Sequence, residues 1–336
     1  MASQEAAVKM ILFYCVVTFS VFPNAIVIFT VPKTERDMKI HDMLLVSLAV
    51  SDSVRAILGH LPEVATTHGQ LVLKDGQAST CTWSGFFICF LSYVSVTHMM
   101  TLPLEQLLHI LHPAHWSRIL QSSRLKGLLI VFIWCYGLMF AIPPVLGVSS
   151  YRIEAGVCSL YWEDPYIAGK TFILSLFVLM YLVPITVIFV SFCQIRRELK
   201  SMKSIADKLF HQKNYALLKK YKVQKRHTLL VLTMICSFFV LWTPYACVAI
   251  MMVLKVQMTY TQGWVSAFLG KSTVLMNPLL YLFLKGSYKS KLLRLLQRRS
   301  KVSPDVFIDG LYVEDFKRSP TITEASWISH TRTWTI

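Results

Sequence analysis

Seven long apolar runs constrain this chain more than any other feature of its sequence. They extend over residues 8–31, 43–64, 82–108, 127–148, 172–192, 228–254 and 263–284. A run of about 20 apolar residues forms a helix that crosses the hydrocarbon core of a bilayer. Only 15% of the residues are charged, against about a quarter in an ordinary soluble domain. The sequence therefore predicts an all-α membrane protein, a bundle of seven transmembrane helices.

The positive charge predicts how the bundle is oriented. The net charge is +16, and eleven Lys or Arg residues lie in the connection 193–227 between the fifth and sixth runs. Loops rich in Lys and Arg stay in the cytoplasm. We therefore expect a multi-pass protein of the cell membrane with its N-terminus outside. The charge would face anionic membrane lipid and a cytoplasmic protein, and no nucleic-acid partner is expected.

The end of the chain divides into two segments. Residues 285–299 are basic and carry several leucines, which predicts a short amphipathic helix on the membrane surface, an eighth helix. The polar residues that follow predict disorder. We expect one transmembrane domain over residues 1–298 and a disordered cytoplasmic tail over residues 299–336, with hydroxyls that a kinase can phosphorylate.

Polar residues and prolines lie inside the apolar runs. Asn24 and Asp52 are near the middle of the first two runs, and a charged group there costs about 2.5–3.5 kcal/mol. Pro184, Pro244 and Pro278 fall in the last three runs. Each proline frees a backbone carbonyl that a neighbouring helix must satisfy. This pattern indicates a bundle that rearranges.

Two cysteines differ from the other six in their position. Cys81 lies at the outer end of the third run and Cys158 in the second outer loop. The outer side of a cell membrane is oxidising, so we expect a disulfide between them. The other six cysteines lie in apolar runs or, for Cys193, directly at the end of one, where packing explains them.

In this order, these residues resemble the rhodopsin-type (class A) G-protein-coupled receptors across residues 8–298. Six of the seven helices, all but the third, carry a residue that matches the family's signature position. The residues that match these positions, the motif of the seventh helix and the family disulfide are Asn24, Asp52, Trp134, Pro184, Pro244, Asn277, Pro278, Tyr281, Cys81 and Cys158. The resemblance implies a heterotrimeric G protein as partner, and arrestin and a receptor kinase acting on the tail.

Lys271 narrows the resemblance to the opsins. It lies six residues before Asn277, about 9 Å along a helix, too deep for its amine to reach the membrane surface easily. Opsins resemble this chain in having a Lys at that spacing, where it carries retinal as a Schiff base. The chemistry needs a primary amine, which condenses with the aldehyde. The resemblance implies retinal, 11-cis or all-trans, as cofactor and a photoreceptor membrane as location.

A protonated Schiff base in an apolar site needs a negative partner. Vertebrate visual opsins have an acid three residues after the disulfide cysteine, but Ser84 stands there in this chain. Glu63 lies eleven residues after Asp52, which places both on nearly the same helix face, and some jellyfish opsins resemble this. Glu154 in the outer loop is the alternative counterion. Arg55, three residues after Asp52, is spaced to pair with it.

The resemblance also implies the lining of a retinal pocket. An apolar, aromatic slot suits a polyene. The positions that match opsin residues around the chromophore are Trp242, Tyr245, Phe238, Tyr181, Phe87, Cys89 and Ser92.

The cytoplasmic end of the third run departs from the family pattern. The family has an acid, an Arg and an aromatic residue there, whereas this chain has Glu105-Gln106-Leu107. Gln224 stands where many opsins have the acid that binds that Arg. The residues implied for the activation switch are Asn24, Asp52, Glu105, Gln106, Asn277, Pro278 and Tyr281. No metal site is expected from the three histidines at 109, 112 and 115, because zinc needs a further ligand in a fixed geometry.

Three functions are compatible with these residues. The first is a light-sensing receptor, not an enzyme, in which retinal isomerises and a G protein is activated. The alternative is a retinal photoisomerase or a retinal-binding protein with weak or no signalling, which Gln106 in place of Arg favours. The third is a receptor for a diffusible ligand that pairs with Lys271.

Overall fold

The computed structural model describes residues 2–30, 39–67, 77–113, 116, 122–154, 156–208 and 215–277. The predicted eighth helix and tail lie outside these residues, as do Pro278, Tyr281 and the end of the seventh run. Among the described residues, six helical stretches are long and apolar enough to cross a membrane. They confirm the first six predicted spans, and the seventh run is described as far as Asn277.

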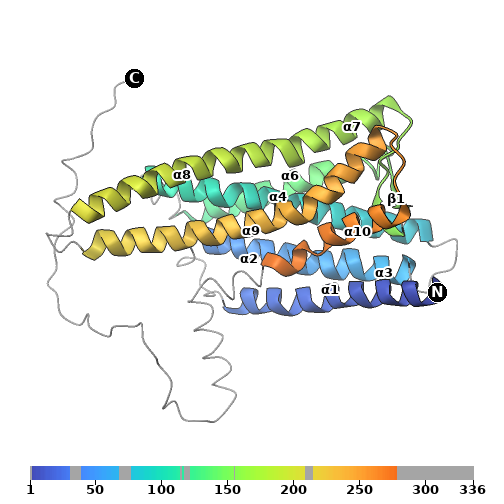
Figure 1. The fold of residues 1–336 in the computed structure, drawn as a ribbon, viewed down its shortest axis with the longest axis horizontal. Coiled ribbons are helices and arrows are strands. Elements are labelled where there is room, and N and C mark those ends of the chain that lie inside the picture. The colour runs from blue at the N-terminus through green and yellow to red at the C-terminus, as the bar shows by residue number, and fades with distance from the viewer. Residues whose placement is uncertain are drawn as a thin grey trace, which may run out of the picture. The chain divides into compact units, whose positions relative to one another are not determined.

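The helices lie side by side along one direction (Figure 1). In chain order they are α1 (Ala2–Thr30), α2 (Ile40–Val54), η1 (Arg55–His60), α3 (Leu61–Thr67), α4 (Gln77–Leu111), α6 (Ser123–Ala141), α7 (Ile167–Phe177), η3 (Val178–Leu182), α8 (Val183–Lys208), α9 (Tyr215–Val253) and α10 (Tyr260–Lys271). The short segments η1 and η3 are π-helical and join their neighbours into continuous second and fifth spans.

Helix α4 is the centre of the bundle, because it contacts α2, α3, α6, α8 and α9. The largest buried cluster packs around it and includes Leu48, Met99 and Phe238. Large apolar side chains also point outward, among them Phe22 and Phe189. Apolar surface of this kind needs contact with hydrocarbon, as in a membrane.

A two-stranded hairpin, which the sequence analysis did not predict, lies at one end of the bundle (Figure 1). Strand β1 (Tyr151–Glu154) pairs antiparallel with β2 (Val157–Leu160). The turn between them contains Gly156 at φ 74°, a left-handed conformation that glycine adopts easily. The predicted disulfide between Cys81 of α4 and Cys158 of β2 is present and fastens the hairpin to the bundle.

The fourth span ends earlier than predicted. The apolar run continues to residue 148, but α6 ends at Ala141 and turns follow it. Pro143 and Pro144 come next. Proline has no backbone N–H and its ring clashes with the preceding turn, so a helix does not continue through the pair.

Helical structure extends into the basic connection between the fifth and sixth spans. Most of it is helical, because α8 continues to Lys208 and α9 begins at Tyr215. Its Lys, Arg, Glu and Gln residues are good helix formers. The positive charge therefore lies on helical extensions that reach beyond the end of the apolar bundle (Figure 1).

Candidate functional site

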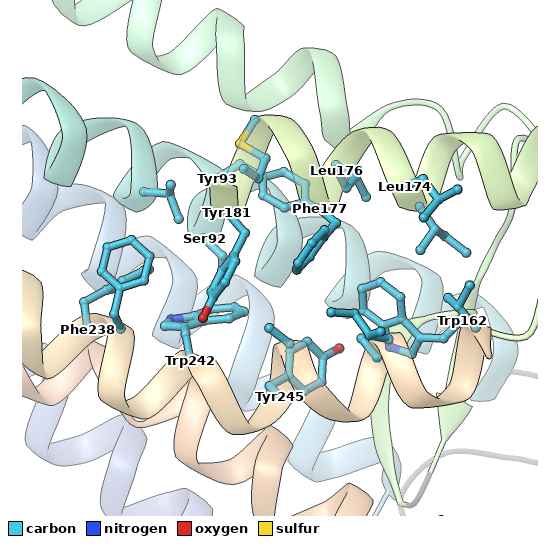
Figure 2. A pocket seen from close by; sticks show the side chains of 18 of the residues that line it. Ser92, Tyr93, Trp162, Leu174, Leu176, Phe177, Tyr181, Phe238, Trp242 and Tyr245 are labelled. Atoms are coloured by element: carbon cyan, nitrogen blue, oxygen red, sulfur yellow. The ribbon is translucent and has the colours of Figure 1, made fainter. Parts of the chain in front are cut away.

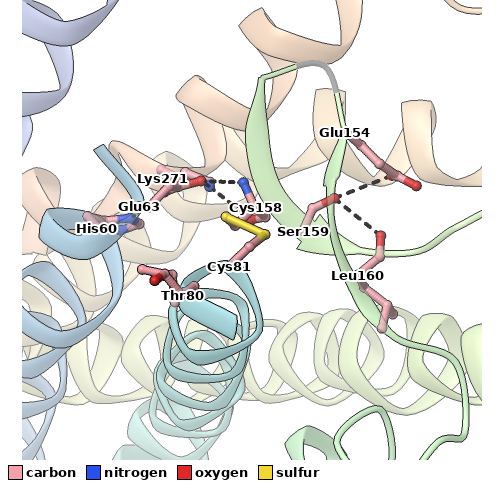
Figure 3. Close-up of a disulfide and its surroundings, with 10 residues drawn as sticks. His60, Glu63, Thr80, Cys81, Glu154, Cys158, Ser159, Leu160 and Lys271 are labelled. Atoms are coloured by element: carbon pink, nitrogen blue, oxygen red, sulfur yellow. Dashed lines mark hydrogen bonds and ion pairs between the residues drawn. A yellow bond between two sulfur atoms is a disulfide. The ribbon is translucent and has the colours of Figure 1, made fainter. Parts of the chain in front are cut away.

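Lys271 and Glu63 form a buried ion pair between α10 and α3 (Figure 3). The Nζ atom of Lys271 donates to Oε1 of Glu63 and, at 3.2 Å, to the carbonyl oxygen of Cys158. The backbone N–H of Cys158 donates to the same Oε1 atom at 2.7 Å. The amine, the carboxylate and the backbone N–H and C=O of Cys158 thus make a closed set of contacts beneath the hairpin.

Local structure explains why Lys271 points inward. Helix α10 begins with a capping box in which Thr259 and Gln262 satisfy the first backbone N–H groups. Its outer half is packed against α1, since Trp264 and Phe268 stack on each other and both contact the ring of Phe13 edge-on. The residue at the end of this fixed helix, Lys271, is buried in the bundle.

The π-helical segment η1 sets the position of Glu63. The prediction that Asp52 and Glu63 share a helix face uses 3.6 residues per turn. The π-helical turns of η1 between them are wider and change that angle. Glu63 still points inward and is fully buried. His60, the last residue of η1, is also buried, and its Nδ1 atom lies 3.6 Å from Oε2 of Glu63.

Two cavities with a shared wall lie near this ion pair, and Lys271 lines the smaller one. The larger has a volume of about 240 Å³ and lies between η3, α4 and α9 with an aromatic and aliphatic lining (Figure 2). The smaller, about 70 Å³, is lined by Lys271, Arg55 and His60. The residues that line both cavities are Ser92, Tyr93, Trp162, Trp242 and Tyr245.

Most of the predicted pocket residues lie in these linings. Trp242, Tyr245 and Ser92 line both cavities, Tyr181 and Phe238 line the larger one, and Cys89 lines the smaller one. Phe87 is the exception. It lines neither cavity, and its ring packs against Trp83 and Phe86 instead.

Three residues of the site, Tyr93, Trp162 and His60, are not among those predicted from the sequence. Tyr93 follows Ser92 on the third span, and Trp162 lies four residues after Cys158. Each is therefore close in sequence to a residue that was predicted. His60 had the clearest signal, because it is a titratable residue inside the second span, three residues before Glu63.

Glu154 lies in a separate environment. Its carboxylate accepts a hydrogen bond from Ser159 at 3.4 Å, and it lines a third cavity of about 310 Å³ together with Tyr260 and Met258. Burial raises its pKa to about 7. Ser159, Trp162, Tyr245 and Ala267 line both this cavity and the cavity at Lys271. The carboxylate in contact with Lys271 is that of Glu63.

Asp52 and Arg55 form a second buried ion pair, at 2.9 Å. Arg55 also donates to Ser92 at 2.9 Å and to Thr273 at 3.3 Å. Asp52 in turn accepts from Asn277 at 2.8 Å. This pair therefore joins the second, third and seventh spans, and the charge of Arg55 is compensated within the membrane.

Further hydrogen bonds link this cluster to its neighbours. Asn24 donates to the carbonyl of Val274 at 3.3 Å and so ties the first span to the seventh. The indole N–H of Trp242, in the lining of both cavities, donates to Thr273 at 3.3 Å. Thr273 thus contacts both the cavity lining and Arg55.

The Glu105-Gln106 pair also makes contacts between spans. Gln106 donates to the hydroxyl of Thr228 on α9 at 2.6 Å and to the carbonyl of Gln224 at 3.4 Å. Glu105 lies 3.8 Å from Nδ1 of His41. A neutral side chain therefore joins α4 to α9 at the position where the family has an ion pair.

Comparisons with known proteins agree with this architecture. The model of the family described as "7 transmembrane receptor (rhodopsin family)" matches residues 23–281. The chain is 26% identical to Opsin-VA of Rutilus rutilus over 261 residues, which are 76% of this chain and 65% of that protein. It is 28% identical to the green-sensitive opsin of Gallus gallus over 258 residues, 74% of this chain and 68% of that one. The crystal structure of squid rhodopsin superposes with a TM-score of 0.75 over 88% of this chain and 87% of its own, at 19% identity, and so shares the fold.

Proposed function

Because the chain belongs to the rhodopsin family of seven-transmembrane receptors, we propose that it is a light-sensing opsin that binds retinal on Lys271 and activates a heterotrimeric G protein. The observation that carries this proposal is a buried primary amine, paired with a carboxylate, in a small cavity that shares part of its lining with a larger aromatic one. The relatives named above include opsins and a rhodopsin.

The residues present fit retinal. A polyene needs an apolar slot with few polar groups, and aromatic and aliphatic side chains line the larger cavity. A Schiff base needs a primary amine, which Lys271 provides. Bound there, retinal would supply absorption of visible light and a change of shape on isomerisation.

The polar residues around Lys271 have distinct roles in this proposal. Glu63 holds a negative charge beside Nζ and so keeps a proton on the nitrogen. The backbone N–H and C=O of Cys158 hold the two members of the pair in place. The hairpin covers the amine and excludes water, which strengthens the pair.

A chain of hydrogen bonds connects the cavity with the rest of the bundle. A displacement of Trp242 would strain its bond to Thr273, which also receives a bond from Arg55. Arg55 and Asp52 pass the change to Asn277 in the seventh span. One set of buried polar contacts thus couples the shape of the cavity to the packing of the bundle core.

At the other end of the bundle, the bonds from Gln106 to Thr228 and Gln224 would have to break for α9 to move away from α4. The basic extensions of α8 and α9 then supply a positive surface for the G protein and for anionic lipid. Arrestin and a receptor kinase would act on residues 299–336, which lie outside the described residues.

Two measurements test the proposal in sequence. The purified protein mixed with 11-cis-retinal should form a visible band shifted well beyond that of free retinal, and borohydride should fix the retinal covalently. Light should then accelerate nucleotide exchange on a G protein. A pigment without light-dependent exchange would instead support a photoisomerase or a retinal-binding protein. The absence of any pigment would contradict both.

A further inference from the structure

His60 is a buried imidazole to which the proposed function gives no role. It is fully buried and lines the same cavity as Lys271. Its Nδ1 atom lies 3.6 Å from Oε2 of Glu63, within ion-pair range and longer than a hydrogen bond. Neither ring nitrogen makes a hydrogen bond to any other described residue. Buried polar groups are usually paired, so this imidazole calls for an explanation.

The two carboxylate oxygens of Glu63 face different partners. Oε1 accepts from Lys271 Nζ and from the backbone N–H of Cys158, whereas Oε2 faces the ring of His60 (Figure 3). The amine and the imidazole therefore approach the same carboxylate from two sides. A positive charge on either one compensates the carboxylate.

The charges around the cavity balance while Lys271 is charged. Arg55 is paired with Asp52 and Lys271 with Glu63. A further cation on His60 would then have no carboxylate of its own. If Nζ loses its charge, the buried carboxylate of Glu63 loses the cation that it contacts, which is unfavourable. One proton must then bind to Glu63 or to a neighbour.

The geometry favours His60 as that neighbour. The N–H of Cys158, which donates to Oε1, carries no titratable proton, and such a bond stabilises the ionised carboxylate. A protonated ring would give Oε2 a charged donor as well. Cys89 and Tyr93 also line the cavity, but their charged forms are anions and cannot compensate Glu63.

We propose that His60 is a positioning residue that takes up a proton on Nδ1 when Lys271 loses its charge, so that Glu63 stays ionised in both states. One proton leaves Nζ and one binds the lone pair of Nδ1, and no electron is transferred. The proton uptake itself does not depend on the proposed function. Only its physiological trigger does, because that trigger would be the light-driven loss of the charge at Nζ.

The test removes the charge permanently and needs no retinal. In the full chain, Lys271→Met should leave Glu63 ionised and His60 protonated. Infrared spectra with isotope-labelled histidine should therefore show one additional imidazolium and no new carboxylic acid. Adding Glu63→Gln should abolish the imidazolium signal, which assigns it to a ring beside Glu63. This control does not depend on whether a His60 variant folds.

A matched substitution at His60 completes the test. Asn places an amide donor near the position of Nδ1 but takes up no proton, so Lys271→Met with His60→Asn should show a carboxylic acid band that Glu63→Gln removes. A carboxylic acid band in Lys271→Met itself, or no additional imidazolium there, would overturn the proposal. Failure to form a pigment with retinal would contradict the opsin proposal. It would not affect the protonation of His60 measured in the Lys271→Met variant.

Discussion

Glu63 and Lys271 lie 208 residues apart in sequence and meet as a buried ion pair. The carboxylate comes from the second span and the amine from the seventh. Each is the natural partner for the other, because an isolated charge of either sign at this depth is unfavourable.

Replacement of Lys271 by Ala should abolish covalent pigment formation. No other described lysine lines the two cavities, and the condensation needs a primary amine. Borohydride reduction after incubation with 11-cis-retinal measures the outcome. The double variant Lys271→Ala with Glu63→Gln is the control, because it leaves no unpaired carboxylate and should fold as well as the natural chain. A covalent visible pigment from either variant would refute the assignment.

Replacement of Glu63 by Gln should move the visible band of the dark pigment to the near ultraviolet at neutral pH. The protonated nitrogen would lose the carboxylate that Lys271 contacts. Glu154→Gln is the matched control and should alter the dark spectrum far less, because Glu154 contacts Ser159. Dark titrations in chloride-free buffer compare the two variants. The reverse pattern would make Glu154 the counterion.

Reduction or replacement of the Cys81–Cys158 disulfide should destabilise the protein. The bond closes a loop with a sequence separation of 77 residues, for which a chain-entropy estimate gives about 4 kcal/mol. Surface delivery and thermal inactivation of Cys81→Ser, Cys158→Ser and the double variant should show equal losses, since either change breaks the same bond. Wild-type amounts of protein from the double variant would show that the bond is dispensable.

Glu154 should make stability depend on pH near neutrality. Burial raises its pKa from 4.5 to about 7 in the folded protein, so the folded state binds the proton more tightly than the unfolded state. Stability should therefore decrease as the pH rises from about 4.5 to about 7. Inactivation half-lives in detergent across this range measure the effect. Glu154→Gln should flatten the profile, and an unchanged slope would exclude Glu154 as its source.

Replacement of Arg55 by Met should cost about 3–5 kcal/mol, because it leaves Asp52 buried without its cation. The double variant Arg55→Met with Asp52→Asn removes both charges and should recover most of that loss. Unfolding or inactivation of both variants in the same detergent provides the comparison. If the double variant is no more stable than the single one, the loss comes from packing around Arg55 and not from the charge.

Much of the fold follows from the sequence because a membrane permits few solutions. The apolar runs locate six spans, and the charge in the connection 193–227 gives their orientation. Helix ends were less predictable, because hydropathy does not report them. Pro143 ends α6 inside an apolar run, and α8 continues as a helix far into a polar one.

The candidate site shows the same division. Lys271 and Glu63 could be predicted because a buried charge is conspicuous and needs a partner of opposite sign. The contribution of Cys158 could not, since it depends on the hairpin and not on the side chain. Phe87 packs against Trp83 and lines neither of the two cavities, because a matching position does not fix the direction of a side chain.

The backbone contacts of Cys158 have a consequence for mutagenesis. Its N–H and C=O contact Glu63 and Lys271, and almost every substitution at this position keeps both. Side-chain mutagenesis would therefore report only the disulfide at residue 158 and would not detect its backbone hydrogen bonds to the ion pair. Only a change in the main chain itself, such as an amide-to-ester replacement at Cys158, would expose these bonds.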